Sequence, residues 1–117
     1  HIQLALELYY DKYGTYFVAG AGYFPCGCGW VGYEDTGAYR KAVTRGLQEE
    51  GFLPVSRMDD PIQNPGYMFY YCGDKYALSA TLENPTSQDI VYIQTTCNGS
   101  GGNGTYNVYG KNYAVAN

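Results

Sequence analysis

The chain has 117 residues, a net charge of −4 and few charged side chains, only 15% of the total. This length favours one domain with a modest core, and its seven Lys and Arg residues are too few and too scattered to displace the counterions of a nucleic acid. No run of about 18 apolar residues occurs, so a membrane anchor would have to lie ahead of His1.

The first predicted element is a helix that ends at Gly14. Ile2, Leu6, Tyr9 and Tyr13 recur at spacings of three and four residues, which is typical of one apolar helical face. Gly14 tolerates the left-handed conformation that closes many helices. No capping residue precedes Ile2, so we expect the helix to begin upstream of the sequence given.

A loop and a second helix follow. Residues 15–31 are rich in glycine and aromatic side chains and predict a loop. Residues 37–50 predict a helix with Asp35 or Thr36 as its N-cap, because apolar side chains repeat every four residues before Gly51. Within the preceding loop, we expect Trp30 and the nearby Tyr33 to offer an exposed aromatic contact.

The second half predicts mainly strands, which makes the fold class α+β within a single domain, residues 1–117. After a turn-dense stretch at residues 59–66, residues 67–82 predict a hairpin that turns at residues 73–74. Residues 89–97, rich in β-branched side chains, predict a third strand. The predicted sheet region, residues 67–117, ends with a glycine-rich turn at residues 98–104 and a short hairpin at residues 105–116.

Four cysteines, an even number in a small domain, favour disulfides in an oxidising compartment. Cys26 and Cys28 are separated by one residue, so we expect each of them to pair with Cys72 or Cys97. Two connectivities remain open on this argument. A zinc site with four thiolate ligands is the alternative, but the ligands of such sites normally come in C-x2-4-C pairs.

Four segments, in this order, resemble the type IV pilins and the major pseudopilins of type II secretion. They are residues 2–16 (IQLALELYYDKYGTY), 47–54 (LQEEGFLP), 58–61 (MDDP) and 67–82 (YMFYYCGDKYALSATL). In that family the first segment is the end of a long helix that runs into a loop. The others lead through a turn to a hairpin.

The resemblance implies a pilin-like fold, in which the N-terminal helix packs on an antiparallel sheet. It also implies an apolar helical segment upstream that anchors the precursor in the membrane. The function implied is that of a structural subunit in an extracellular filament of identical subunits on the cell surface, with minor pilins as further partners. The helix face of Ile2, Leu6, Tyr9 and Tyr13 would then serve assembly.

Two alternatives remain open: a secreted binding module of the minor pilin or adhesin kind, and a secretion pseudopilin with a calcium site. Major pseudopilins bind calcium through acidic residues late in the chain, but residues 98–104 contain no acid and only Glu83 and Asp89 lie nearby. We therefore predict no cofactor and keep calcium as the alternative.

No enzyme is predicted. His1 is the single histidine, so a Ser-His-Asp or Cys-His mechanism would have to recruit His1 itself as its base. Glu49 and Glu50 are neighbours on a predicted helix and would not converge on one substrate. The pair Asp59 and Asp60, which precedes a proline, is typical of a turn.

Overall fold

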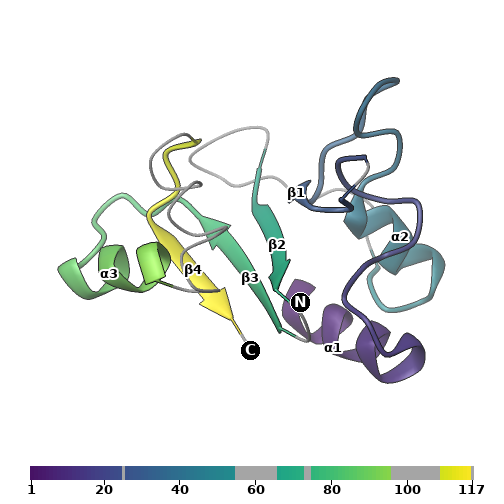
Figure 1. Ribbon diagram of the computed structural model, residues 1–117, viewed down its shortest axis with the longest axis horizontal. Helices are drawn as coiled ribbons and strands as arrows, with labels where there is room; N and C mark the ends of the chain where they lie inside the picture. The colour runs from purple at the N-terminus through teal and green to yellow at the C-terminus, as the bar shows by residue number, and fades with distance from the viewer. Residues whose placement is uncertain (25, 55–65, 73–74, 96–108, 117) are drawn as a thin grey trace.

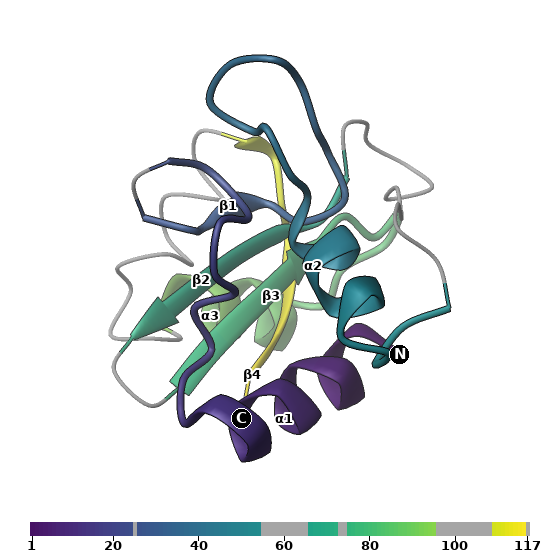
Figure 2. The same cartoon turned by 90° about the vertical axis from the view of Figure 1, so that its right-hand side faces the viewer.

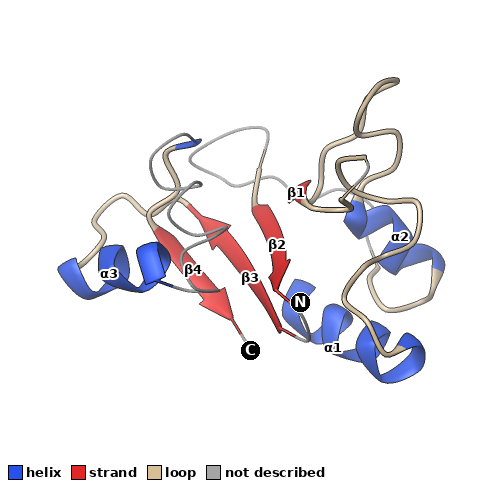
Figure 3. Ribbon diagram, in the orientation of Figure 1, coloured by secondary structure: helices blue, strands red, loops and turns tan. Residues whose placement is uncertain are grey.

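The computed structural model describes residues 1–24, 26–54, 66–72, 75–95 and 109–116. Within them the strands form one antiparallel sheet of four strands in the order β1-β2-β3-β4. Together with the helices this arrangement confirms the α+β class (Figure 1, Figure 3). The elements are α1 (Ile2–Tyr13), β1 (Gly29–Trp30), α2 (Val43–Glu49), β2 (Met68–Cys72), β3 (Lys75–Ala80), α3 (Ser87–Thr95) and β4 (Tyr113–Ala116).

The sheet separates two helical layers. The helices α1 and α2 lie on one face of it, and α3 lies on the other face beside β4 (Figure 1, Figure 2). Because side chains alternate along a strand, Phe69 of β2 and its register partner Leu78 of β3 point to the same face. Phe69 belongs to the buried cluster that includes the α1 side chains, so this face is the one under α1 and α2.

The main core lies between α1, α2 and the sheet. Leu6 of α1, Leu47 of α2 and Phe69 of β2 are completely buried there. The Tyr16 ring packs edge-on against the Tyr76 ring, with 4.9 Å between the ring centroids. The full cluster of buried residues is Ile2, Ala5, Leu6, Tyr9, Tyr16, Val18, Ala21, Val31, Val43, Leu47, Leu53, Phe69 and Tyr76.

The end predicted for the first helix is confirmed. Gly14 has φ 72° and its N–H donates to the carbonyl oxygen of Tyr10 at 2.7 Å, which closes α1 in the left-handed conformation. The hairpin predicted over residues 67–82 is also confirmed, with β2 and β3 paired from Met68–Ser79 to Cys72–Lys75. Residues 59–65, 73–74 and 98–104, where turns were predicted, lie outside the described residues.

The second helix is shorter than predicted, because α2 begins at Val43 instead of residue 37. The side chain of Asp35 does cap backbone N–H groups: its Oδ1 accepts from Gly37 at 2.8 Å and from Tyr39 at 3.0 Å. These bonds close a local turn and the chain does not continue as a helix from it. Tyr39 therefore lies in a loop, where its hydroxyl accepts from the Trp30 N–H at 3.2 Å.

The third predicted strand is wrong. Residues 87–95 form α3, and a capping box explains why. The Asp89 N–H donates to Thr86 Oγ1 at 3.1 Å, and Asp89 Oδ2 accepts from the Thr86 N–H at 2.8 Å. These reciprocal bonds satisfy the backbone N–H groups of Thr86 and Asp89 at the start of the helix. In a strand, such groups would need hydrogen bonds to a neighbouring strand.

The last hairpin, predicted over residues 105–116, is only half described. Its second half is the strand β4, which pairs antiparallel with β3, from Ala77–Ala116 to Ala80–Tyr113. Residues 105–108 lie outside the described part. The partner that the structure assigns to β4 is therefore β3, an element about 35 residues earlier.

Candidate assembly surface

The helix α1 is apolar on two sides. On the inner side Ile2, Ala5, Leu6 and Tyr9 are buried in the main core. On the outer side Leu4 is 66% exposed and Leu8 is 39% exposed. These two leucines are four residues apart, one helical turn, so their side chains lie next to each other on the open face.

The predicted assembly face therefore divides in two. Ile2, Leu6 and Tyr9 hold the protomer together, and buried side chains cannot touch a neighbouring subunit. Tyr13, at 46% exposure, lies at the edge of that face. The part played by this face in assembly stays a prediction, but the surface open to a partner is that of Leu4 and Leu8.

The sequence contained a signal for this outer surface. Leu4 and Leu8 repeat at a spacing of four, as the core residues do, but they are displaced by two positions from Ile2 and Leu6. Two positions along a helix correspond to about 200°, which turns the side chain nearly to the opposite side. The single apolar face predicted from the sequence left these two leucines out.

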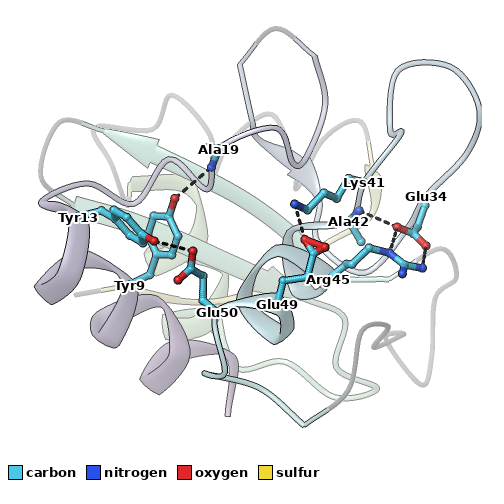
Figure 4. A network of polar contacts seen from close by, with 9 residues as sticks. All are labelled: Tyr9, Tyr13, Ala19, Glu34, Lys41, Ala42, Arg45, Glu49 and Glu50. Atoms are coloured by element: carbon cyan, nitrogen blue, oxygen red, sulfur yellow. Dashed lines mark hydrogen bonds and ion pairs between the residues drawn. The ribbon is translucent and has the colours of Figure 1, made fainter.

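Polar contacts fix the C-terminal end of α1 to the end of α2. Glu50 receives one bond from Lys12 Nζ at 2.8 Å. It receives another from the Tyr13 hydroxyl at 2.6 Å (Figure 4). The Tyr9 hydroxyl accepts from the Ala19 N–H at 3.1 Å and thereby holds the loop that follows the helix. The orientation of α1 is thus set by side-chain bonds as well as by burial.

These contacts shift the ionisation of the three groups. The hydrogen bonds from Lys12 and Tyr13 lower the pKa of Glu50, since they stabilise its carboxylate. The same carboxylate raises the pKa of Lys12, and it raises the pKa of Tyr13 by accepting its proton in a hydrogen bond. All three groups are reached by solvent, so the interaction is weak and sensitive to salt.

A second set of charges lies along α2. Lys41 Nζ is 2.5 Å from Glu49 Oε1, and the guanidinium of Arg45 binds both carboxylate oxygens of Glu34 (Figure 4). Glu34 also accepts from the N–H of Ala42, the N-cap residue of α2, at 3.1 Å. The adjacent carboxylates of Glu49 and Glu50 therefore bind different cations, Lys41 and Lys12 respectively.

The disulfide pairing predicted for the loop is wrong. Cys26 and Cys28 are bonded to each other, with 5.3 Å between their Cα atoms. Gly27 between them has φ 69°, a left-handed conformation that turns the chain within one residue and brings the two sulfur atoms together. Cys72 is also disulfide-bonded, and Cys97 lies outside the described residues.

The aromatic contact predicted at Trp30 and Tyr33 is not an open platform. Both side chains are only partly exposed. The Trp30 ring packs edge-on against Tyr109, and the Nζ of the buried Lys111 lies 5.5 Å from the Trp30 ring centroid. Exposure is far larger at Phe24, where 78% of the side chain is open.

In the part of the chain that the structure describes, no three His, Cys, Asp or Glu residues come together as metal ligands. Asp89, considered for calcium, uses its carboxylate in the cap of α3. Among the described helices, none combines the length and apolar character needed to cross a bilayer. The pair Asp59 and Asp60 lies outside the described residues.

Comparison of the chain with known protein families, with curated proteins and with solved structures finds no match. The fold class consequently depends on the structure alone. The interpretation of its function depends on the four sequence segments and on the surface of α1.

Proposed function

We propose that the chain is a structural subunit of an extracellular, pilus-like filament that assembles through α1. The single observation that carries the proposal is the outer side of this helix, where Leu4 and Leu8 expose adjacent apolar side chains while the inner side is already buried. A helix that is apolar on two sides can bury one side in its own protomer and the other in a neighbour.

The type of contact follows from this geometry. If the outer side of α1 meets a different surface of the next subunit, the contact is heterologous and extends into an open helical polymer. Four segments of the sequence resemble filament-forming pilins, which supports this form of assembly over a closed dimer. Membership of that family is part of the proposal.

The energetics require more than two leucines. Complete burial of one leucine side chain contributes about 1.5–3 kcal/mol, whereas association of two proteins costs roughly 4–15 kcal/mol in lost freedom of motion. Leu4 and Leu8 can therefore position the contact but cannot supply all of its stability. In the proposed filament the rest comes from an apolar helical segment ahead of α1, which would also anchor the precursor in the membrane.

The proposal is tested in the organism that makes the protein, by substitution in the natural gene. The double variant Leu4→Asp/Leu8→Asp places two charges on the outer side of α1, where both leucines are exposed in the described part of the structure. We expect surface filaments to disappear from electron micrographs, while the melting temperature of the 117-residue chain stays within about 3 °C of the original, since exposed substitutions change stability little.

The matched control is Val91→Asp. Val91 is also an exposed apolar residue on a helix, at 59% exposure, but it lies on α3 at the other face of the sheet. We expect this variant to form filaments in normal number. Normal filaments from the double variant, or equal loss from both variants, would contradict a specific role for α1.

A further inference from the structure

An apolar hollow of about 540 Å³ lies between two loops on the α2 side of the protein, away from the outer surface of α1. Its lining includes the aromatic residues Phe17, Tyr23 and Phe24, the basic residue Arg40, and the glycines Gly22 and Gly27. This volume is within the range of about 300–1,000 Å³ that is usual for small-molecule sites.

Backbone contacts hold the walls of the hollow in place. The Gly22 N–H donates to the Lys41 carbonyl oxygen at 2.9 Å, and the Phe24 N–H donates to that of Ala38 at 3.0 Å. These two bonds join the two chain segments that line the hollow. The protein's own backbone bonds consequently hold the walls in place, which reduces the entropy lost when a ligand binds.

Two glycines in the wall are required by close packing. A Cβ atom on Gly27 would lie 2.8 Å from the Phe17 ring, and one on Gly22 would lie 2.6 Å from the Gly27 carbonyl carbon. Both residues also have positive φ, 77° at Gly22 and 69° at Gly27. The disulfide between Cys26 and Cys28 brackets Gly27 and fixes the turn that supports this wall.

The charge of the hollow is opposite to that of the protein. The net charge of the chain is −4, yet Arg40 lines the hollow, and among the described residues that line it there is no Asp or Glu. Lys12, Lys41 and Arg45 each form an ion pair. The guanidinium of Arg40, by contrast, forms no ion pair with any residue in the described part of the chain. An exposed guanidinium beside apolar rings is suited to a carboxylate, which it can bind through two parallel hydrogen bonds.

We propose that this hollow binds a small carboxylate with a flat aromatic body. The aromatic body packs against Phe24 and Tyr23, and the carboxylate binds Arg40. A sugar acid fits less well, since hydroxyl groups need several polar side chains and the hollow offers few. The site is independent of filament assembly, because its residues are on the two loops and not on α1.

The test is a titration of the 117-residue chain followed by NMR, with 2-naphthylacetate as the probe. We expect saturable shifts of the backbone amides of Tyr23, Phe24 and Ala38 with a dissociation constant on the order of 0.1–1 mM, as is usual for a ligand of this size. The neutral analogue 2-(2-naphthyl)ethanol has nearly the same shape without the charge, and we expect it to bind at least 5-fold more weakly.

Three variants assign the contacts. Arg40→Gln and Phe24→Ala change exposed side chains, so both should fold, and each should weaken binding of 2-naphthylacetate at least 5-fold. Lys75→Gln removes the same charge from an exposed position outside the hollow and should change binding less than 2-fold. Absence of saturable shifts up to 10 mM probe, equal affinity for the neutral analogue, or tighter binding of glucuronate would overturn the proposal.

Discussion

The helices α1 and α3 lie on opposite faces of one sheet and are held in different ways. In α1 four side chains are buried, and polar bonds fix its last turn to α2. In α3 the buried side chain is that of Ile93, while Val91 and Tyr92 are exposed. A helix with several core residues is recognisable from its periodicity, whereas one with a single core residue depends on its cap.

The largest expected effect is at the inner side of α1. Leu6→Ala removes a completely buried side chain from the main core, and we expect the free energy of unfolding to fall by about 2–5 kcal/mol. Urea unfolding followed by circular dichroism measures this change. Leu4→Ala is the matched control on the same helix, and its effect should stay within about 0.5 kcal/mol. Equal effects of the two substitutions would contradict the assignment of inner and outer sides.

A smaller effect is expected at the buried residue of α3. Ile93 is completely buried but lies outside the main cluster, so Ile93→Ala should cost about 2 kcal/mol, at the low end for such a substitution. We expect the loss to be local, with amides of α3 exchanging about 30-fold faster in hydrogen exchange and those of α1 changing less. Equal acceleration in both helices would show that the two layers unfold as one unit.

A still smaller effect on stability is expected at the N-terminal cap of α3. Thr86→Ala removes the hydroxyl that accepts from the Asp89 N–H, and we expect a cost of about 1 kcal/mol. Thr86→Ser keeps the hydroxyl and should retain most of the stability. Thermal unfolding of the two variants measures the difference. An unchanged melting temperature in Thr86→Ala would show that the capping box does not stabilise α3.

The smallest expected effect is a pH dependence at the end of α1. Because the folded state lowers the pKa of Glu50 below its ordinary value of 4.5, its contribution is complete above that value and is lost as the pH falls through the lowered pKa. Lys12 acts in the opposite range, since its pKa is raised above 10.5 and its contribution is lost as the pH rises through the raised value.

The matched measurement compares Glu50→Gln with the original protein from pH 7 to pH 2. We expect the loss of melting temperature below pH 4.5 to be smaller in the variant, since one carboxylate that favours the folded state in its charged form is gone. If the melting temperatures of the two proteins fell equally below pH 4.5, the bonds from Lys12 and Tyr13 to Glu50 would have no influence on stability.

The sequence predicted the elements whose burial follows a regular period. The inner side of α1 and its end at Gly14 follow from helical spacing, and the hairpin of β2 and β3 from its strands and turn. The strand predicted over residues 89–97 failed because β-branched residues were given more weight than the capping box of Thr86 and Asp89. The start of α2 was misplaced because an Asp35 side chain that caps a turn looks the same in sequence as one that caps a helix.

The proposed assembly surface and binding hollow were harder to predict because they depend on where the chain folds back. The outer leucines of α1 are visible in the sequence, but their exposure is decided by which side meets the sheet. The disulfide between Cys26 and Cys28 depends on the positive φ of Gly27, which residue spacing alone does not specify. The hollow is lined by residues from the segments 17–27 and 37–40, which backbone hydrogen bonds hold together. No periodic pattern in the sequence predicts such a contact.

We propose that the inner side of α1 stabilises the protomer and that its outer side forms the filament contact. A cryo-electron microscopy reconstruction of filaments from the natural protein tests it most directly. We expect Leu4 and Leu8 to lie within about 4.5 Å of apolar atoms in a neighbouring subunit, and Leu6 to contact only its own protomer. A reconstruction in which both outer leucines face solvent would contradict it.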